Sequence, residues 1–328
     1  MENWIQTVRI QNFKSLKDVS LECERINLFV GKPNVGKSNL LEALALFGPN
    51  YLNSGLGFAK NLIRYESIAD IFYDQNVFDE KIEITAKGFG QVEISIRQEQ
   101  VFYEMKGRGK DFLTIETDLT GNNLKYNFDK NKLLSPVKRY QFPESQKFEK
   151  KSNWLFLSPP NGDNLITILQ TNKTFREEVS DIFEPYGLEL FVDTHGSRIE
   201  IVKKRDGILF KTPFSLIADT LRRYMFHLAA IESNRNSVLL FEEPESHNYP
   251  PYITQLANRI IQEKTNQYFI TTHSPFLFNT LVEEAKGIAI FLLEYEDFQT
   301  KVRRLSEDNL REILDYGLNI FTEHDFFV

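Results

Sequence analysis

The pattern of apolar and polar positions differs between the two ends of the chain and its middle. At both ends, short apolar runs bounded by turns alternate with segments whose apolar residues recur every three or four positions, which predicts strands alternating with helices. This alternation favours an α/β fold built on a largely parallel sheet. The expected strands are 4–10, 18–30, 237–241, 267–272 and 288–293, and the expected helices are 39–47, 215–232, 251–264 and 276–285.

The middle of the chain has shorter alternating runs, separated by turns that contain glycine or polar residues, and this pattern is typical of antiparallel strands. We therefore expect a core divided between residues 1–50 and 213–328, with residues 51–212 as an inserted α+β region. The strands expected in the insertion are 81–86, 91–97, 100–105, 188–192, 199–203 and 208–210, with helices at 58–73 and 165–183; the polar stretch 112–152 is not assigned.

Composition narrows the class of protein only in part. The chain has 328 residues and a single cysteine, Cys23, which excludes an intrachain disulfide and a cysteine zinc site. No apolar run approaches the roughly 20 residues of a membrane span. The first residues also lack the basic region and apolar run of a secretion signal. We therefore expect a soluble cytoplasmic protein.

The net charge of −7 argues against nucleic-acid binding over the whole surface. Two local basic stretches remain: one holds Lys138, Arg139, Lys147, Lys150 and Lys151, and the other holds Lys203, Lys204 and Arg205. Each stretch is either a solvated loop or turn, or part of a DNA-binding face, and the sequence leaves both readings open.

The segment 31–38 carries the clearest chemical signal. It reads Gly-Lys-Pro-Asn-Val-Gly-Lys-Ser, between an apolar strand and a helical segment, which is the context of a phosphate-binding P-loop. Its backbone N–H groups and the helix N-terminus favour phosphate. Lys37 can reach the β- and γ-phosphates, and Ser38 can hold Mg²⁺. The residues expected to bind ATP are Gly31, Asn34, Val35, Gly36, Lys37, Ser38 and Asn39; no residue that would distinguish ATP from GTP is identifiable.

Two further apolar strands end in groups suited to ATP hydrolysis. The strand 237–241 is followed by Glu242 and Glu243, and ligands bind at the carboxyl ends of such strands. We expect Glu242 to assist Mg²⁺ and Glu243 to activate water; an acidic turn is the alternative. The strand 267–272 ends at His273, which either hydrogen-bonds the γ-phosphate or is structural. The predicted catalytic residues are thus Lys37, Glu243 and His273, and the predicted metal ligands are Ser38 and Glu242.

The order of these three motifs resembles the ABC-type ATPases of the SMC, RecF and OLD group, and Val8–Leu16 is similar to the start of those proteins. The resemblance implies a P-loop NTPase with an ABC-type ATPase core, in which a mixed, mainly parallel sheet is flanked by helices. It also implies nucleotide contacts from Lys14 and from a signature segment at 213–223. There Ser215 is expected to begin a helix and to meet phosphate, although an ordinary helix cap is the alternative.

Three departures from the resemblance bear on function. Glu242 stands where the family often has Asp, which is expected to alter metal geometry and slow turnover. The residue that links the metal to the insertion is open among Asp70, Tyr73 and Gln75. About 35 residues follow Leu293, and we expect a solvated tail with apolar anchors there in place of the Toprim nuclease domain of OLD proteins.

The function implied by the resemblance is an ATP-hydrolysing homodimer or higher homo-oligomer with Mg²⁺ and ATP as cofactors. By analogy with short OLD-like ATPases of bacterial antiphage systems, it would control a separate effector or nuclease. A RecF-like DNA-repair ATPase and a nucleotide-bound scaffold with little hydrolysis are the alternatives.

Overall fold

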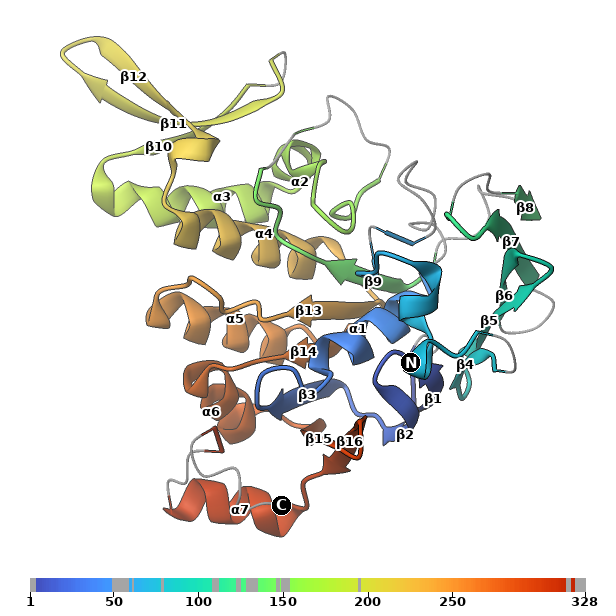
Figure 1. The fold of residues 1–328 in the computed structure, drawn as a ribbon. Coiled ribbons are helices and arrows are strands. Elements are labelled where there is room, and N and C mark those ends of the chain that lie inside the picture. Colours follow the sequence, from blue (N-terminus) through green and yellow to red (C-terminus); the bar gives the residue numbers. More distant parts are fainter. Residues whose placement is uncertain are drawn as a thin grey trace. The chain divides into compact units, whose positions relative to one another are not determined.

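A computed structural model (Figure 1) describes residues 4–48, 59–60, 62–77, 80–107, 112–121, 125–127, 135–145, 148, 154–193, 196–316 and 320–321. The chain forms two compact units: Met1–Arg139, Asn236–Glu243 and Thr265–Val328 make the first, and Tyr140–Arg235 and Pro244–Lys264 make the second. The division into a core and an insertion at residues 50 and 213 stays a prediction about domains.

The first unit contains a six-stranded mixed sheet in the order β16-β15-β3-β14-β13-β9. Four neighbouring strands, β15, β3, β14 and β13, run parallel, and β16 is antiparallel to β15. The α/β fold with a mainly parallel sheet is therefore confirmed. The strands are β3 (Ile26–Gly31), β9 (Val137–Tyr140), β13 (Val238–Glu242), β14 (Gln267–Thr271), β15 (Ile288–Glu296) and β16 (Gln299–Arg304).

Strands β3 and β14 are buried along their whole length, as their continuous apolar sequences predict for central parallel strands. Helix α1 (Lys37–Ala45) follows β3 and packs against β13 and β14 (Figure 1). Helices α6 (Pro275–Glu284) and α7 (Glu307–Tyr316) follow later strands of the same unit. The predicted phosphate-binding segment 31–38, called the glycine loop from here on, joins the carboxyl end of β3 to the amino end of α1.

The second sheet of the first unit is entirely antiparallel, in the order β2-β1-β4-β5-β6-β7-β8. The hydroxyl of Tyr103 in this sheet donates a 2.6 Å hydrogen bond to the carbonyl of Leu46, just after α1, which ties the sheet to the helix. Its strands are β1 (Thr7–Phe13), β2 (Leu16–Glu22), β4 (Ile82–Ala86), β5 (Gly90–Arg97), β6 (Gln100–Gly107), β7 (Phe112–Asp118) and β8 (Lys125–Asn127).

The second unit combines helices with a three-stranded antiparallel sheet, β10-β11-β12. Arg259 on α5 pairs with Glu178 on α3 and, at 2.8 Å, with Glu232 on α4, so one guanidinium links three helices. The elements are α2 (Leu165–Thr171), α3 (Lys173–Phe183), β10 (Glu189–Asp193), β11 (Arg198–Arg205), β12 (Ile208–Pro213), α4 (Asp219–Ser233) and α5 (Pro250–Gln262). No helix among the described residues is long and apolar enough to cross a bilayer.

Three predicted elements are wrong because polar side chains interrupt them. The strand expected at 18–30 is two strands, since Asn27 bonds the backbone N–H and carbonyl of Glu24 and fixes a turn. The helix expected at 58–73 is wrong for the described residues, which form two 3₁₀ turns, the first capped by Ser67 and Asp70. The helix expected at 165–183 breaks at Asn172, whose side chain caps α3.

The carboxyl end holds one strand and one helix that the sequence did not predict. The strand at 288–293 is not the last, because β16 pairs antiparallel with it at the sheet edge. The tail, expected to be solvated with apolar anchors, contains α7, in which the apolar side chain of Ile313 is buried as an anchor would be. Strand β16 was not predicted because its sequence has no apolar run: four of its six residues are charged or glutamine.

One buried histidine predicts how stability depends on pH. His227 on α4 is buried and donates its Nδ1–H to the carbonyl of Arg223 at 2.9 Å. Burial lowers the pKa of His227 from 6.5 to about 4. Between these two pH values the imidazole is protonated in the unfolded chain but still neutral in the folded chain, so a falling pH favours unfolding. We expect the wild type to lose about 3 kcal/mol more stability than His227→Gln between about pH 7 and pH 4.

Urea unfolding at a series of pH values measures this difference. His247, which is exposed, provides the matched control: His247→Gln is expected to follow the wild type. Parallel pH profiles for the wild type and His227→Gln would contradict the assignment.

Candidate functional site

The glycine loop lies where β3 ends, and its backbone conformation requires its glycines. Gly31 has φ 150 and Gly36 has φ 96, values that L side chains rarely adopt. A Cβ on Gly31 would overlap the carbonyl of Leu293, and one on Gly36 would overlap Thr300 Oγ1. Asn34 also has a positive φ, of 64, as its short polar side chain tolerates. The loop is therefore held in a tightly curled form.

Neighbouring elements hold this loop in place. Thr300 on β16 donates to the carbonyl of buried Val35 at 2.8 Å, and its hydroxyl shares a 2.7 Å hydrogen bond with Ser15. Asn39 on α1 donates to the same Ser15 hydroxyl at 2.8 Å. The hairpin turn between β1 and β2, the edge strand and α1 thus converge on the loop.

Lys37 crosses the loop with a buried side chain. Its ammonium donates to the carbonyls of Gly31 at 3.0 Å and Lys32 at 2.8 Å. Burial lowers the pKa of Lys37 to about 8, although Glu243 and Glu242 act in the opposite direction. The charge of Lys37 is therefore close enough to interact with Glu242, the last residue of β13, and with Glu243, which follows it.

Ser38 and Glu242 meet although they lie 204 residues apart in sequence. The Ser38 hydroxyl donates a hydrogen bond to Oε1 of Glu242, and Arg139 Nη2 donates to Oε2 at 2.5 Å. Burial alone would raise the pKa of Glu242, but Arg139, Ser38 and Arg64 together hold it below its ordinary value. A charged carboxylate and a hydroxyl are thus presented side by side, as a hard cation requires.

Glu243 and His273 lie together at the same edge of the sheet. Glu243 has φ 43, and its N–H donates to the carbonyl of Thr271 at 3.0 Å. Its carboxylate is 3.5 Å from Nε2 of His273, which follows β14. Burial and the charge of Lys37 lower the pKa of His273, while Glu243 opposes them. The predicted groups from β3, β13 and β14 are therefore brought together.

Two predicted nucleotide-binding residues have other surroundings. The ammonium of Lys14 pairs with the carboxylate of Glu42 and donates to the carbonyl of Arg64 at 2.6 Å. Ser215 belongs to the second unit and does not begin a long helix, because it lies in the 3₁₀ turn Phe214–Leu216 and α4 starts only at Asp219. The helix expected at 215–232 is corrected accordingly.

Asp70, Tyr73 and Gln75 remain open as the residue that links the metal to the insertion. Asp70 accepts hydrogen bonds from the N–H of Ser67 at 2.7 Å and from Gln75 at 3.0 Å, and Tyr73 is buried.

The sequence did not predict a buried charge cluster that lies beside the loop. Glu42 on α1 is fully buried and contacts Lys14, Arg64 and Arg139. Arg139 on β9 is also fully buried and donates to the carbonyl of Leu62 as well as to Glu242. The one available signal was Glu42 itself, a single acid within the apolar run 40–47 that follows the loop.

The structure corrects both readings of the first basic stretch, a solvated loop or a DNA-binding face, for two of its residues. Lys138 and Arg139 are buried in β9, where Lys138 donates to the Ser237 hydroxyl at 3.0 Å, so they contribute neither to a solvated loop nor to a DNA-binding face. Lys147, Lys150 and Lys151 lie outside the described residues. Residues Lys203, Lys204 and Arg205 are exposed at the end of β11, next to the turn of its hairpin.

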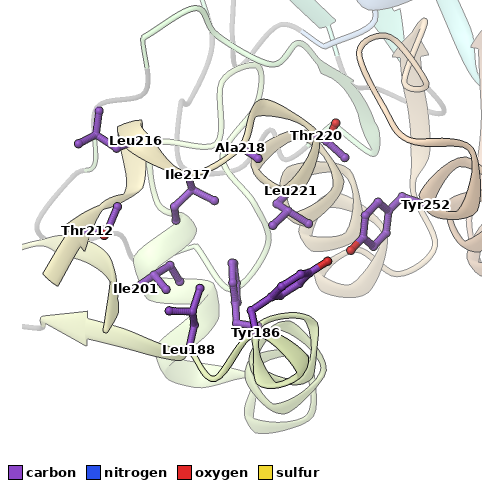
Figure 2. A pocket seen from close by; sticks show the side chains of 11 residues that line it. Tyr186, Leu188, Ile201, Thr212, Leu216, Ile217, Ala218, Thr220, Leu221 and Tyr252 are labelled. Carbon is purple, nitrogen blue, oxygen red and sulfur yellow. The ribbon is translucent and has the colours of Figure 1, made fainter. Parts of the chain in front are cut away.

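The second unit contains an apolar cavity of about 460 Å³, which is lined in part by residues of the segment 213–223. Figure 2 shows Ile217 and Leu221 lining it opposite Leu188, and Tyr186 and Tyr252 with their hydroxyl groups directed toward one another. None of the lining residues in the described chain is charged. This cavity therefore differs in chemistry from the loop and its acids.

The tight packing of Gly36 predicts a large cost for a single methyl group. Gly36→Ala would combine an unfavourable φ with overlap of an anchored threonine, so we expect a loss of roughly 2–4 kcal/mol in unfolding free energy. Gly207→Ala is the matched control, since Gly207 has φ 79 and nothing lies within 4 Å of the position that an added methyl group would take; it should cost only about 1–2 kcal/mol. Equal losses in urea unfolding would contradict the role of Thr300.

Comparison with known proteins indicates the family of the chain. The model of the AAA_21 family, described as "AAA domain, putative AbiEii toxin, Type IV TA system", matches residues 26–279. A protein of Helicobacter pylori named "ATP/GTP phosphatase" is 22% identical over 376 aligned positions, which cover 97% of this chain and 100% of that protein.

Solved structures show the same fold at low identity. An SMC head bound to the C-winged helix domain of ScpA superposes with a TM-score of 0.56 and 15% identity, covering 94% of this chain and 100% of the other. A head with an extended coiled coil, bound to the C-terminal domain of ScpA derived from Pyrococcus furiosus, gives 0.54 and 14%, with coverage of 96% and 99%. The fold is therefore that of ABC-type ATPase heads, and the chain belongs to the AAA_21 family of AAA-domain ATPases.

Proposed function

We propose that the chain binds Mg²⁺–ATP at the glycine loop and hydrolyses the terminal phosphate. The observation that carries this proposal is the hydrogen bond between Ser38 and Glu242, beside the buried ammonium of Lys37. In this arrangement the loop and α1 hold the phosphates, and Lys37 exchanges its two carbonyl partners for the β- and γ-phosphates.

The residues beside the loop fit a magnesium ion. Mg²⁺ prefers oxygen ligands and is usually bound by one or two protein groups together with substrate phosphates and water. Ser38 and Glu242 supply a hydroxyl and an ionised carboxylate in direct contact, which suits this preference. When bound, the ion would neutralise charge on the phosphates during transfer to water.

Glu243 is the residue best placed to activate the attacking water. Its backbone is fixed by two hydrogen bonds to Thr271, and its side chain is about half exposed, so water can reach it. The lowered pKa of His273 favours the neutral imidazole, which can donate one hydrogen bond to the γ-phosphate. In this proposal Glu243 is the general base and His273 reports the presence of the terminal phosphate.

We further propose that ATP joins two copies of the chain and thereby controls a separate effector or nuclease, in antiphage defence. Exposed Ser215 and Leu216 in the segment 213–223 are available to meet nucleotide held by a second copy. The two SMC heads are described as bound to domains of ScpA, and the family description names a toxin and a toxin–antitoxin system. Both support the control of a partner protein. A cytoplasmic location stays a prediction.

Two alternatives each retain one supporting observation. The exposed Lys203, Lys204 and Arg205 favour direct DNA contact, whose affinity would fall steeply with salt. Glu242, in place of the shorter Asp, favours a scaffold that binds nucleotide and turns over little.

Two substitutions test the proposed function. Glu243→Gln removes the general base and should lower Mg²⁺-dependent ATP hydrolysis by roughly 100-fold or more, while ATP stays bound and stabilises a dimer. Lys37→Ala should abolish both nucleotide binding and the dimer. Hydrolysis is measured as released phosphate, and the dimer as molar mass in solution with and without ATP.

Lys32→Ala provides the matched control, because Lys32 is an exposed lysine of the same loop, and its activity should remain close to that of the wild type. Nucleotide binding that survives Lys37→Ala, or hydrolysis that survives Glu243→Gln, would contradict the proposal. Bound ATP without turnover or dimer formation in the wild type would favour the scaffold.

A further inference from the structure

Arg139 lies behind the predicted metal ligand Glu242. We propose that Arg139 is a positioning residue that orients the Glu242 carboxylate toward the divalent cation, and that Glu42 is the buried counter-charge that holds Arg139 in place. This inference rests on the proposed function, because it concerns the cation that accompanies the nucleotide.

The two oxygen atoms of Glu242 have different partners on different elements. Oε1 accepts from the hydroxyl of Ser38 on α1, and Oε2 is 2.5 Å from Nη2 of Arg139 on β9. Strand β9 neighbours β13, the strand that ends at Glu242. The carboxylate is thus held at both oxygens, which fixes the rotation of its last bond.

A glutamate needs this second anchor more than an aspartate would. Its side chain has one more rotatable bond, and its terminal torsion has a broad energy minimum. Ser38 alone would leave the carboxylate free to turn about the shared hydrogen bond. The arginine therefore compensates for the longer acid at this position.

Helix α1 supplies the counter-charge from the same face as Ser38. Ser38 and Glu42 are four residues apart, so their side chains lie one above the other on the helix. Glu42 Oε1 is 3.8 Å from Nη1 of Arg139, and both side chains are fully buried. An arginine buried without a partner would be strongly unfavourable. Ser38 thus contacts Glu242, Glu242 contacts Arg139 and Arg139 contacts Glu42, and α1, which carries both Ser38 and Glu42, connects the two ends of this series.

Arg64 gives an internal comparison for Arg139. Its Nε is 2.8 Å from Glu42 Oε1 and its Nη2 is 3.5 Å from Glu242 Oε1, so it contacts the same two acids. Its side chain, however, is 65% exposed, whereas that of Arg139 is 0% exposed. Solvent weakens such an exposed ion pair, and we therefore assign the positioning role to Arg139 alone.

The experiment measures cation binding separately from hydrolysis. The affinity of Mn²⁺ for the full chain loaded with β,γ-imido-ATP is followed by electron paramagnetic resonance, and nucleotide affinity is measured in EDTA. The variants are Arg139→Lys, the double variant Arg139→Met with Glu42→Gln, which removes both buried charges together, and Arg64→Met as the matched control. Thermal unfolding monitors the fold of each.

We expect the double variant to bind the nucleotide in EDTA like the wild type and to bind Mn²⁺ about 10–100-fold more weakly. Hydrolysis should then need more cation for half-maximal rate, with partial recovery of kcat at saturating Mn²⁺. Arg139→Lys keeps the charge but loses the two-pronged geometry, so it should weaken Mn²⁺ binding by a smaller factor. Arg64→Met should bind Mn²⁺ like the wild type.

Unchanged Mn²⁺ affinity in Arg139→Lys and in the double variant would overturn the inference while leaving the proposed function intact. An equal loss in Arg64→Met would also overturn it, since any nearby positive charge would then suffice. Failure of the wild type itself to bind the nucleotide would overturn the proposed function and this inference together. Should the double variant not fold, Arg139→Lys carries the test, and wild-type cation affinity in it would refute the role.

Discussion

Buried charge at the edge of the parallel sheet constrains the whole region around the glycine loop. Glu42, Arg139 and Lys14 come from α1, β9 and the hairpin turn after β1, and Glu42 contacts both basic groups. Because a buried charge left without its partner costs several kcal/mol, these elements cannot slide relative to one another without a large penalty. Arg139 also pairs with Glu242 at the end of β13, which adds this acid to the cluster.

Neutral hydrogen bonds also hold the glycine loop. Thr300 on the antiparallel edge strand bonds the carbonyl of Val35 and the hydroxyl of Ser15, so β16 supports the loop although it carries none of the predicted chemistry. A loop fixed before it meets phosphate does not have to be ordered during binding. The charge cluster and Thr300 therefore fix the positions of Glu242 and of the glycine loop.

Local signals made the chemical groups of the site predictable. Each of these groups belongs to a short stretch of sequence: the glycines precede a helix, and the acids and His273 each follow an apolar strand. Parallel pairing of the strands then brings their carboxyl ends together. Strand β9 was not predictable, because two of its four residues are basic. The acids that compensate the charge of Arg139 are also distant in sequence: Glu242 lies 103 residues after it, and Glu42 lies far before it. The 3₁₀ turns at Ile68–Ile71 and Tyr73–Gln75 were likewise missed, since Ser67 and Asp70 bond the backbone that a helix would have used.

In the proposed function, Ser38 and Glu242, held by Arg139, form the cation site of a nucleotide-binding loop. A crystal structure of the Glu243→Gln chain with Mg²⁺ and ATP tests it most directly. We expect the ion about 2.1 Å from the Ser38 hydroxyl, with Glu242 bound to it directly or through one water and Arg139 still on the second carboxylate oxygen. A bound ion with Glu242 turned away, or phosphates held elsewhere than at the glycine loop, would contradict it.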